Sequence, residues 1–298
     1  MSRFAAPGEG SVLLVDKPAG PTSHDVVDRV RRCFGLRRVG HTGTLDPFAT
    51  GLLLICLGPA TRLSEYLTGL DKRYLATLLL GASTDTDDAT GIVVQSSETW
   101  RELGVEQVAA ALDSQVGAIT QLPPTYSSKK VGGERMHRLV RRGESVQAAP
   151  ARVRVYSLEI LDFRPPAVDF AVHCGSGTYV RAIARDVGEA LGTGAHLSAL
   201  RRTAIGSFRV EEAVSLAGLE DGKEPGSALL SPPAALRHLP AFRATAADAA
   251  DVLHGRQISA PEDFRSDGCF AVVDPRGRLV AIAELQGDRI QPRKVFAA

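Results

Sequence analysis

Short apolar runs divide the first two hundred residues of the chain into predicted strands. Three continuous runs, each closed by Gly or Pro, predict buried strands: residues 11–16, 51–57 and 74–80. Two segments in which apolar and polar positions alternate predict half-buried antiparallel strands: residues 153–160 and 168–174. The pattern therefore places strands at the centre of this part of the chain.

Apolar positions at helical spacing predict helices between the strands. One helix begins with a cap at Thr22 or Ser23 and ends at Gly35. A second apolar stripe, over residues 180–191, places Arg181 in the first turn of a helix. Two further helices are predicted over residues 105–116 and 244–254.

The last third of the chain contains a predicted domain boundary. From residue 220 the sequence becomes polar and contains Pro and Gly. Beyond this stretch, residues 270–273 and 279–285 flank a turn sequence, which is the pattern of a β-hairpin. We expect a first domain over residues 1–237 and a small, mainly β domain over 238–298.

Composition excludes several classes of protein. The 298 residues are 44% hydrophobic, 23% charged and 5% aromatic, which is ordinary for a globular protein. There is no apolar run of roughly 18 residues, and the first ten residues lack the features of a secretory signal. The four cysteines stand singly, so we expect them to be reduced, without a zinc site. We expect a cytoplasmic protein without membrane contact.

Charge is unevenly distributed, although the formal net charge is only +1. Residues 129–154 carry eight Lys or Arg against two Glu, and residues 29–38 are also rich in Arg. Such stretches are typical of surfaces that bind a phosphate backbone. Solvated helix faces, or a genome that favours Arg, explain them equally well.

A polar, glycine-rich loop over residues 40–51 leads directly into the second apolar run. Three glycines would allow the backbone to approach a ligand closely: Gly40, Gly43 and Gly51. Pro47 stiffens the chain beside Asp46, which makes Asp46 a candidate catalytic carboxylate. The alternative is turn chemistry, in which an Asp before Pro caps its own backbone.

A run of acidic residues at Asp85, Asp87 and Asp88 resembles the start of a calcium loop. It lacks the Gly and the terminal Glu at the spacing that such a loop requires. We therefore interpret this run as a solvated turn.

Six segments resemble the bacterial tRNA pseudouridine synthases of the TruB type, which isomerise uridine 55 in the T loop of tRNA. They are SVLLVDKPAGPTSHDVV (11–27), GHTGTLDPFATGLLLICLG (40–58), DKRYLATLLLGASTDTDDATG (71–91), LPPTYSSKK (122–130), GSGTYVRAIARDVG (175–188) and GAHLSALRR (194–202). They occur in the family's order and span most of residues 11–210. The C-terminal segment resembles the family's small RNA-binding PUA-type domain only loosely.

The resemblance implies a fold, a partner and a reaction. The fold would be α/β (α+β), with a mixed, mainly antiparallel sheet flanked by helices and a small β-rich PUA-like domain at the C-terminus. The partner would be tRNA, bound through its T arm with the target base flipped out. The reaction moves ribose from N1 to C5 of uracil, so we expect no cofactor and no metal, in agreement with the lack of Walker, Rossmann and metal-ligand motifs. Nothing in the sequence demands more than a monomer.

The resemblance also implies a catalytic pair. Asp46 falls at the position of the family's nucleophilic aspartate, and Arg181 at that of its active-site arginine. A carboxylate enclosed under a flipped base loses water, which raises its pKa unless a cation lies beside it. We expect the permanent charge and forked donors of Arg181 to hold Asp46 ionised, although a first-turn Arg is otherwise usually solvated. Attack of Asp46 on ribose and attack on uracil both remain open.

Four more side chains are implied around the target uridine. Tyr74 matches the family's active-site tyrosine, whose ring stacks on the uracil, a contact worth about 1–3 kcal/mol per base. His41 matches the histidine that enters the space left by the flipped nucleotide. Tyr179 and Leu200 match positions that line the uracil pocket.

Two lysines match less specific parts of these motifs and are grouped with the substrate-binding residues. Lys17 belongs to the DKPxG turn and is interpreted as a support for the catalytic loop. Lys130 ends YSSKK, where the family more usually has YSALK, and is interpreted as a phosphate contact.

Two other classes of function stay open. An RNA-binding or RNA-refolding protein could open the tRNA elbow without chemistry, but it would have no use for a buried carboxylate, which repels phosphate. A nucleosidase would use the same carboxylate to cleave the glycosidic bond permanently and would release free uracil.

Overall fold

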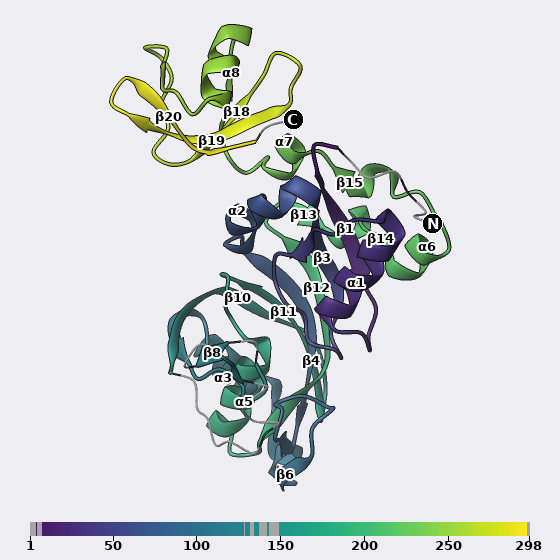
Figure 1. Cartoon of the computed structure of the whole chain (residues 1–298). Helices are drawn as coiled ribbons and strands as arrows, with labels where there is room; N and C mark the ends of the chain where they lie inside the picture. Colours follow the sequence, from purple (N-terminus) through teal and green to yellow (C-terminus); the bar gives the residue numbers. More distant parts are fainter. Residues whose placement is uncertain are drawn as a thin grey trace.

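The computed structural model describes residues 4, 8–127, 129–131, 134–136, 142 and 149–296. Within this part of the chain, eleven strands form one large sheet and five strands form a second, C-terminal sheet. Figure 1 shows the second sheet at one end of the molecule. The small mainly β segment expected near the C-terminus is therefore present.

The large sheet is mixed and mainly antiparallel. Its strands are β1 (Ser11–Lys17), β2 (Val39–His41), β3 (Thr50–Leu57), β4 (Lys72–Leu80), β7 (Gly117–Gln121), β10 (Ala151–Arg164), β11 (Ala167–Cys174), β12 (Ala195–Ile205), β13 (Phe208–Arg209), β14 (Val214–Ser215) and β15 (Leu229–Leu230). The main path runs β14-β1-β3-β12-β4-β11-β10-β7, with the remaining three strands paired beside it. Only the β1–β14 and β3–β12 pairings described in this sheet are parallel. The expected fold class is confirmed.

Helices flank this sheet, and two small hairpins stand apart from it. The helices are α1 (Ser23–Phe34), α2 (Ser64–Thr68), α3 (Val105–Asp113), α5 (Val180–Ala190), α6 (Leu216–Glu220), α7 (Pro232–Ala235) and α8 (Ala246–Leu253). The hairpins are β5 (Ala82–Thr84) with β6 (Val93–Ser96), and β8 (Lys130–Val131) with β9 (Glu134–Arg135). In the part of the chain described here, no helix has both the length and the apolar character needed to cross a membrane.

Local sequence signals account for the ends of α1. The Thr22 side chain accepts a hydrogen bond from the Asp25 backbone, and the Asp25 carboxylate accepts one from the Thr22 backbone. The helix ends at Gly35, whose φ of 63° is left-handed. The cap is thus Thr22, one of the two predicted residues. By contrast, α3 ends at Asp113 rather than at residue 116.

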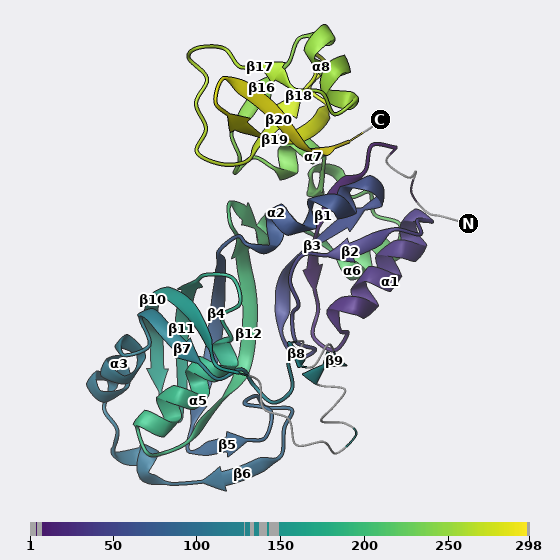
Figure 2. The same cartoon turned by 60° about the vertical axis from the view of Figure 1, so that its left-hand side comes forward.

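Two separate hydrophobic cores lie on the large sheet. One is formed mainly by β1, β3 and α1, and the other by β4, β11, α3 and α5. The apolar stripe predicted over residues 180–191 packs into the second core, because α5 contacts β12, β4 and α3. Figure 2 shows α1 beside β2 and β3, well separated from α3 and α5 beside β10 and β11.

The C-terminal sheet has a core of its own. Its strands are β16 (Ala241–Arg243), β17 (Ile258–Ser259), β18 (Phe270–Val273), β19 (Leu279–Gln286) and β20 (Arg289–Val295). Phe264 packs edge-on against Phe242 and Phe270, and the predicted hairpin of β18 and β19 is confirmed. Arg62 links this sheet to the rest of the molecule, since its Nη1 donates to the Val295 carbonyl at 2.6 Å.

The two halves of the large sheet join where β3 pairs with β12. This pairing has two rungs, Arg201 with Thr50 and Arg202 with Gly51. On its other side, Arg202 pairs with Tyr74 of β4. A β-carbon on Gly51, which has φ +105°, would lie 2.2 Å from the Arg202 carbonyl oxygen. Gly51 therefore permits a close approach of two strands, rather than the approach of a ligand that the sequence suggested.

We expect Gly51→Ala to destabilise the protein strongly. The alanine would meet both an unfavourable φ and the backbone of Arg202, a cost of about 2 kcal/mol or more. The melting temperature measured by calorimetry should fall by several degrees.

Gly69→Ala is the matched control, because no atom lies within 4 Å of its added β-carbon and its φ of −72° suits alanine. Equal melting temperatures for the two variants would contradict the importance of the close approach at Gly51.

Candidate active site

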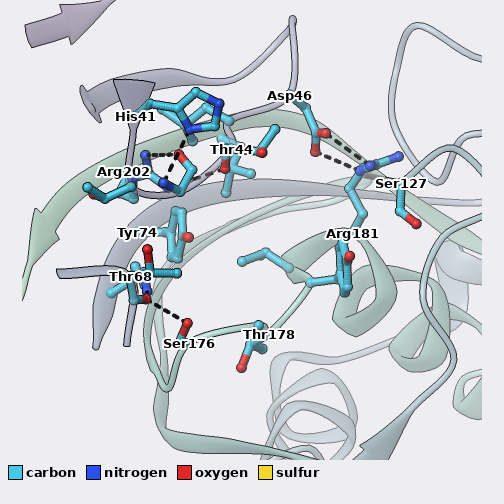
Figure 3. Close-up of a pocket in the computed structure, with 18 residues that line it drawn as sticks. His41, Thr44, Asp46, Thr68, Tyr74, Ser127, Ser176, Thr178, Arg181 and Arg202 are labelled. Carbon is cyan, nitrogen blue, oxygen red and sulfur yellow. Dashed lines mark hydrogen bonds and ion pairs between the residues drawn. The ribbon is translucent and has the colours of Figure 1, made fainter. Parts of the chain in front are cut away.

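A cavity of about 420 Å³ lies where the loop before β3 faces β4, β12 and the start of α5. Its volume is in the usual range for pockets that hold small molecules. Figure 3 shows the side chains that line it. The lining includes six of the eight site residues expected from the sequence: His41, Asp46, Tyr74, Tyr179, Arg181 and Leu200.

Asp46 and Arg181 form an ion pair at one side of the cavity, and Figure 3 shows them pointing toward one another. Arg181 Nη2 donates to Asp46 Oδ1 at 3.1 Å. Arg181 Nε lies 2.9 Å from Oδ2, although its N–H direction does not make a hydrogen bond. The arginine side chain is 3% exposed and that of Asp46 is 28% exposed, so the guanidinium is buried behind a carboxylate that faces the cavity.

Other groups hold the Arg181 guanidinium in place. Nη1 donates to the Thr86 carbonyl at 2.7 Å, and Nη2 donates to the Tyr126 carbonyl at 2.9 Å. Nη1 also lies 3.5 Å from Asp88 Oδ2. Arg181 is thus fixed by loops that are about 55 and 95 residues away in sequence, and it is not the solvated arginine that helices usually carry.

Burial and Arg181 have opposite effects on the pKa of the Asp46 carboxyl. Loss of water raises the pKa of Asp46, and the nearby Asp88 raises it further. The charge and hydrogen bond of Arg181 lower the pKa, with a smaller contribution from Lys17, but the net direction is above the ordinary value of 3.8. The arginine therefore opposes a rise in pKa that burial imposes.

Tyr74 and Arg202 form the wall of the cavity across from this pair. Burial raises the pKa of the Tyr74 phenol, and Arg202 opposes the rise. Arg202 is 1% exposed. Its guanidinium donates to the carbonyls of Leu52 at 2.7 Å, Gly43 at 3.1 Å and Thr44 at 3.3 Å. It thereby fastens the loop that carries Asp46 to β12.

Two buried cations in the lining, Arg202 and Lys72, were not singled out from the sequence. Lys72 is 6% exposed; its ammonium donates to the carbonyls of Thr68 and Leu70, and burial lowers its pKa to about 8. Strand alternation offers a signal for both. Lys72 shares the inward face of β4 with Tyr74, and Arg202 shares that of β12 with Leu200.

His41 and Tyr179 also line the cavity. Nδ1 of His41 accepts a hydrogen bond from the Gly43 backbone at 3.3 Å. Tyr179 precedes α5, and its backbone exchanges two hydrogen bonds with the side chain of the buried Gln121. Burial raises the pKa of the Tyr179 phenol. Both side chains can therefore meet a ligand from fixed backbone positions.

Lys17 contacts the loop that carries Asp46 and does not line the cavity. It is 0% exposed, and Nζ donates to three carbonyls: Pro18 and Pro21 at 2.8 Å and Pro47 at 3.2 Å. Burial lowers its pKa to about 8. All three N–H groups are occupied when the ammonium is charged, so any effect of Lys17 on substrate is indirect. The side chain of Lys130 lies outside the described residues.

The prediction of a solvated turn at residues 85–88 holds for Asp85, which is exposed in a turn, but is wrong for Asp87 and Asp88. Asp88 is 4% exposed. Its Oδ1 accepts hydrogen bonds from the Thr90 backbone at 2.9 Å and from the Thr86 hydroxyl at 2.9 Å, while Oδ2 faces Arg181. Asp87 lies 3.2 Å from Arg185. Asp87 and Asp88 are enclosed because two arginines of α5 pair with them, which sequence spacing does not reveal.

The arrangement can support nucleophilic or electrostatic catalysis by a carboxylate. An ionised Asp46 needs no activating base, and Arg181 orients it toward the cavity. Among the residues whose positions are described, no three His, Cys, Asp or Glu side chains gather closely enough to hold a metal ion.

Comparisons with known proteins identify the family. Residues 31–180 match the N-terminal domain of TruB family pseudouridylate synthases. Residues 181–232 match the tRNA pseudouridylate synthase B C-terminal domain, and residues 239–297 match the tRNA pseudouridine synthase II C-terminal domain. The fold and the buried Asp–Arg pair, together with these matches, define a pseudouridine synthase, which is an isomerase. The chain belongs to the TruB family of pseudouridylate synthases.

Curated relatives cover nearly the whole chain. The tRNA pseudouridine synthase B of Mycobacterium sp. (strain KMS) is 46% identical over 281 residues, which are 92% of each chain. That of Mycobacterium bovis (strain BCG / Pasteur 1173P2) is 43% identical over 290 residues, 96% of this chain and 95% of the relative.

Two solved structures share this fold. A chain of a Cbf5-Nop10-Gar1 complex has a TM-score of 0.73 at 27% identity and covers 96% of this chain and 85% of its own. A chain of an H/ACA RNP bound to a substrate RNA containing 2′-deoxyuridine has a TM-score of 0.71 at 26% identity. The match covers 97% of this chain and 85% of that one.

We expect the Asp46 carboxyl of the free protein to titrate above 3.8, and Arg181→Met to raise its pKa further. The methionine removes the cation that opposes the effect of burial, while Asp88 continues to raise the pKa. Carbon-13 NMR of aspartate-labelled protein measures this titration, with Asp46→Asn to assign the resonance. An Asp46 pKa that stays the same in Arg181→Met would contradict the role given to the arginine.

Proposed function

We propose that the protein converts uridine 55 in the T loop of tRNA to pseudouridine, with Asp46 as the nucleophile. The observation that carries this proposal is the buried Arg181 guanidinium held against both oxygens of a carboxylate that faces the cavity. The names of the relatives at 43–46% identity support tRNA as the substrate.

The reaction begins when the target uridine leaves its stack and enters the cavity. Flipping a base costs a few kcal/mol, and stacking on an aromatic ring such as Tyr74 returns about 1–3 kcal/mol. Tyr179 and the apolar Leu200 complete the walls of the base pocket, and His41 occupies the space that the nucleotide leaves in the RNA.

The chemistry is mass-neutral. The bond from the ribose C1′ to N1 of uracil breaks, the uracil turns, and C1′ bonds to C5, whose proton is lost while N1 gains one. Attack by Asp46 on ribose, and attack on uracil, both give this balance. In either case the carboxylate must be ionised, so activity is present above the pKa of Asp46 and is lost as pH falls through it.

Regions outside the cavity contribute to RNA binding in this proposal. Lys17 supports the catalytic loop, and Lys130 contacts a phosphate. Residues 1–237 form the catalytic domain, and residues 238–298 form a PUA-like domain that contacts the tRNA. The protein acts in the cytoplasm as a monomer, without a cofactor.

Asp46→Asn should abolish product formation, because an amide is not a nucleophile. The affinity for tRNA should be retained or slightly higher, because the amide carries no charge to repel phosphate. Unmodified tRNA transcript is incubated with each protein, and pseudouridine is mapped by chemical derivatisation and primer extension. A transcript with cytidine at position 55 is the substrate control.

Retained turnover by Asp46→Asn would reject the mechanism. Release of free uracil by the wild-type protein would indicate a nucleosidase, and opening of the tRNA elbow without any product would indicate an RNA-refolding protein.

Arg181→Lys should lower kcat on the order of 10²-fold with little change in tRNA affinity. A lysine keeps the charge, but it cannot contact both carboxylate oxygens and the Thr86 and Tyr126 carbonyls together. Single-turnover kinetics and filter binding separate the two quantities. Arg101→Lys, at an exposed pair with Glu98, is the control and should behave as wild type; a wild-type rate for Arg181→Lys would show that its geometry is unimportant.

A further inference from the structure

A second arginine on α5 contacts the same two segments that hold Arg181. Arg181 and Arg185 are four residues apart, so they lie on one face of the helix. Arg181 donates to Thr86 and Tyr126, whereas Arg185 donates to Asp87 Oδ2 at 3.2 Å and to the Leu122 carbonyl at 3.0 Å. Each arginine therefore forms hydrogen bonds from α5 both to residues 86–87 and to residues 122–126.

Arg185 is itself held in a fixed orientation and does not line the cavity. Its Nε and Nη2 donate to Asp186 Oδ1 at 2.9 and 2.8 Å. The side chains of Arg185 and Asp87 are 18% and 13% exposed, and neither residue lines the cavity. Any effect of this pair on catalysis must therefore pass through other residues.

The segment over residues 121–126 has three attachments to the start of α5. Gln121 bonds the Tyr179 backbone, Leu122 accepts from Arg185, and Tyr126 accepts from Arg181. The Leu122 contact is the middle one along the chain. Without it, the position of the Tyr126 carbonyl, and hence of the guanidinium that it orients, would be less firmly fixed, although Gln121 stays paired in β7.

The backbone at Asp87 offers a way to separate the role of its charge from that of its shape. Asp87 has φ +58°, and in the described part of the chain it is the one residue besides glycine with a positive φ. Asn and Gly tolerate this conformation at least as well as Asp. Its backbone is also bonded, since Asp87 N donates to Thr84 and its carbonyl accepts from Leu197. A simple turn at this place does not require a carboxylate.

The charge of Asp87 also costs stability. Burial raises its pKa to about 6, with Asp186 and Asp88 facing it in addition to Arg185 and Arg181, which lower the pKa. The folded pKa lies above the ordinary 3.8, so the ionised group destabilises the fold above about pH 6, and this cost disappears as pH falls toward 3.8. A carboxylate that destabilises the fold at neutral pH is explained better by a positioning role than by a stabilising one.

We propose that Arg185 is a positioning residue, which uses Asp87 and the Leu122 carbonyl to set the orientation of Arg181 against Asp46. This inference rests on the function proposed above, because it assigns Arg185 to the reaction that Asp46 performs.

The test compares Asp87→Asn, Asp87→Gly and Arg185→Met in single-turnover pseudouridine formation. Each should lower the single-turnover rate constant about tenfold or more, since small displacements of a catalytic group are costly, while tRNA affinity stays within about twofold of wild type. The double variant Asp87→Asn with Arg185→Met should be no slower than the slower single variant, because the two residues act as a unit. Arg185→Lys, which keeps the charge, should recover part of the rate.

Two readouts distinguish positioning from a merely structural role. Asp87→Asn should melt at the same temperature as wild type or higher at pH 8, although it is slower. The wild-type rate should also fall as pH drops through about 6, where Asp87 is protonated, and the rate of Asp87→Asn should lack this step. Arg101→Met, which breaks an exposed Arg–Glu pair, controls for the loss of a surface charge.

The outcomes separate the two proposals. Wild-type rates in Asp87→Asn and Arg185→Met, with Asp46→Asn inactive, would overturn the role of Arg185 and leave the proposed function standing. A fall in rate that matches a fall in melting temperature would also overturn it. Turnover by Asp46→Asn would instead overturn the proposed function.

Discussion

The site depends on one interaction, in which a largely buried carboxylate is paired with a buried arginine. Burial raises the pKa of Asp46, and the opposing charge of Arg181 works only if the guanidinium cannot turn away. The Thr86 carbonyl therefore accepts from Nη1, and the Tyr126 carbonyl accepts from Nη2, the nitrogen that also donates to Asp46. Much of the surrounding structure can be understood as the support of this one contact.

The order of the sheet follows from the same constraint. Asp46 comes from the loop that enters β3, whereas Arg181 comes from α5, which packs on β4 and β12. Arg202, at the pairing of β3 with β12, contacts the carbonyls of the Asp46 loop and faces Tyr74. Strand β12 thus fixes the distance between Asp46 and Arg181, which are 135 residues apart in sequence.

Sequence predicted most of the strands and helices, the mixed sheet and the residues around the cavity, because apolar periodicity and motifs are local signals. It did not predict the burial of Asp87 and Asp88 or the part played by Arg202, since an isolated charged residue is usually exposed and its partners lie far along the chain. Lys17 shows the same limit: the DKPxG turn indicated a support for the loop, but not that the ammonium is completely enclosed by three carbonyls.

The two-rung pairing of β3 with β12 has a consequence for how the molecule fails under stress. The hydrophobic cores on either side of it are separate, and each retains its own packing if this junction opens. Opening would strain the contact of Asp46 with Arg181, because Leu45 and Ala49 beside Asp46 pack into the core of α5 while the loop continues into β3, which belongs to the other core. Heat or denaturant should thus abolish activity while most residues are still folded. Spectroscopic signals of secondary structure would then overestimate the fraction of active protein.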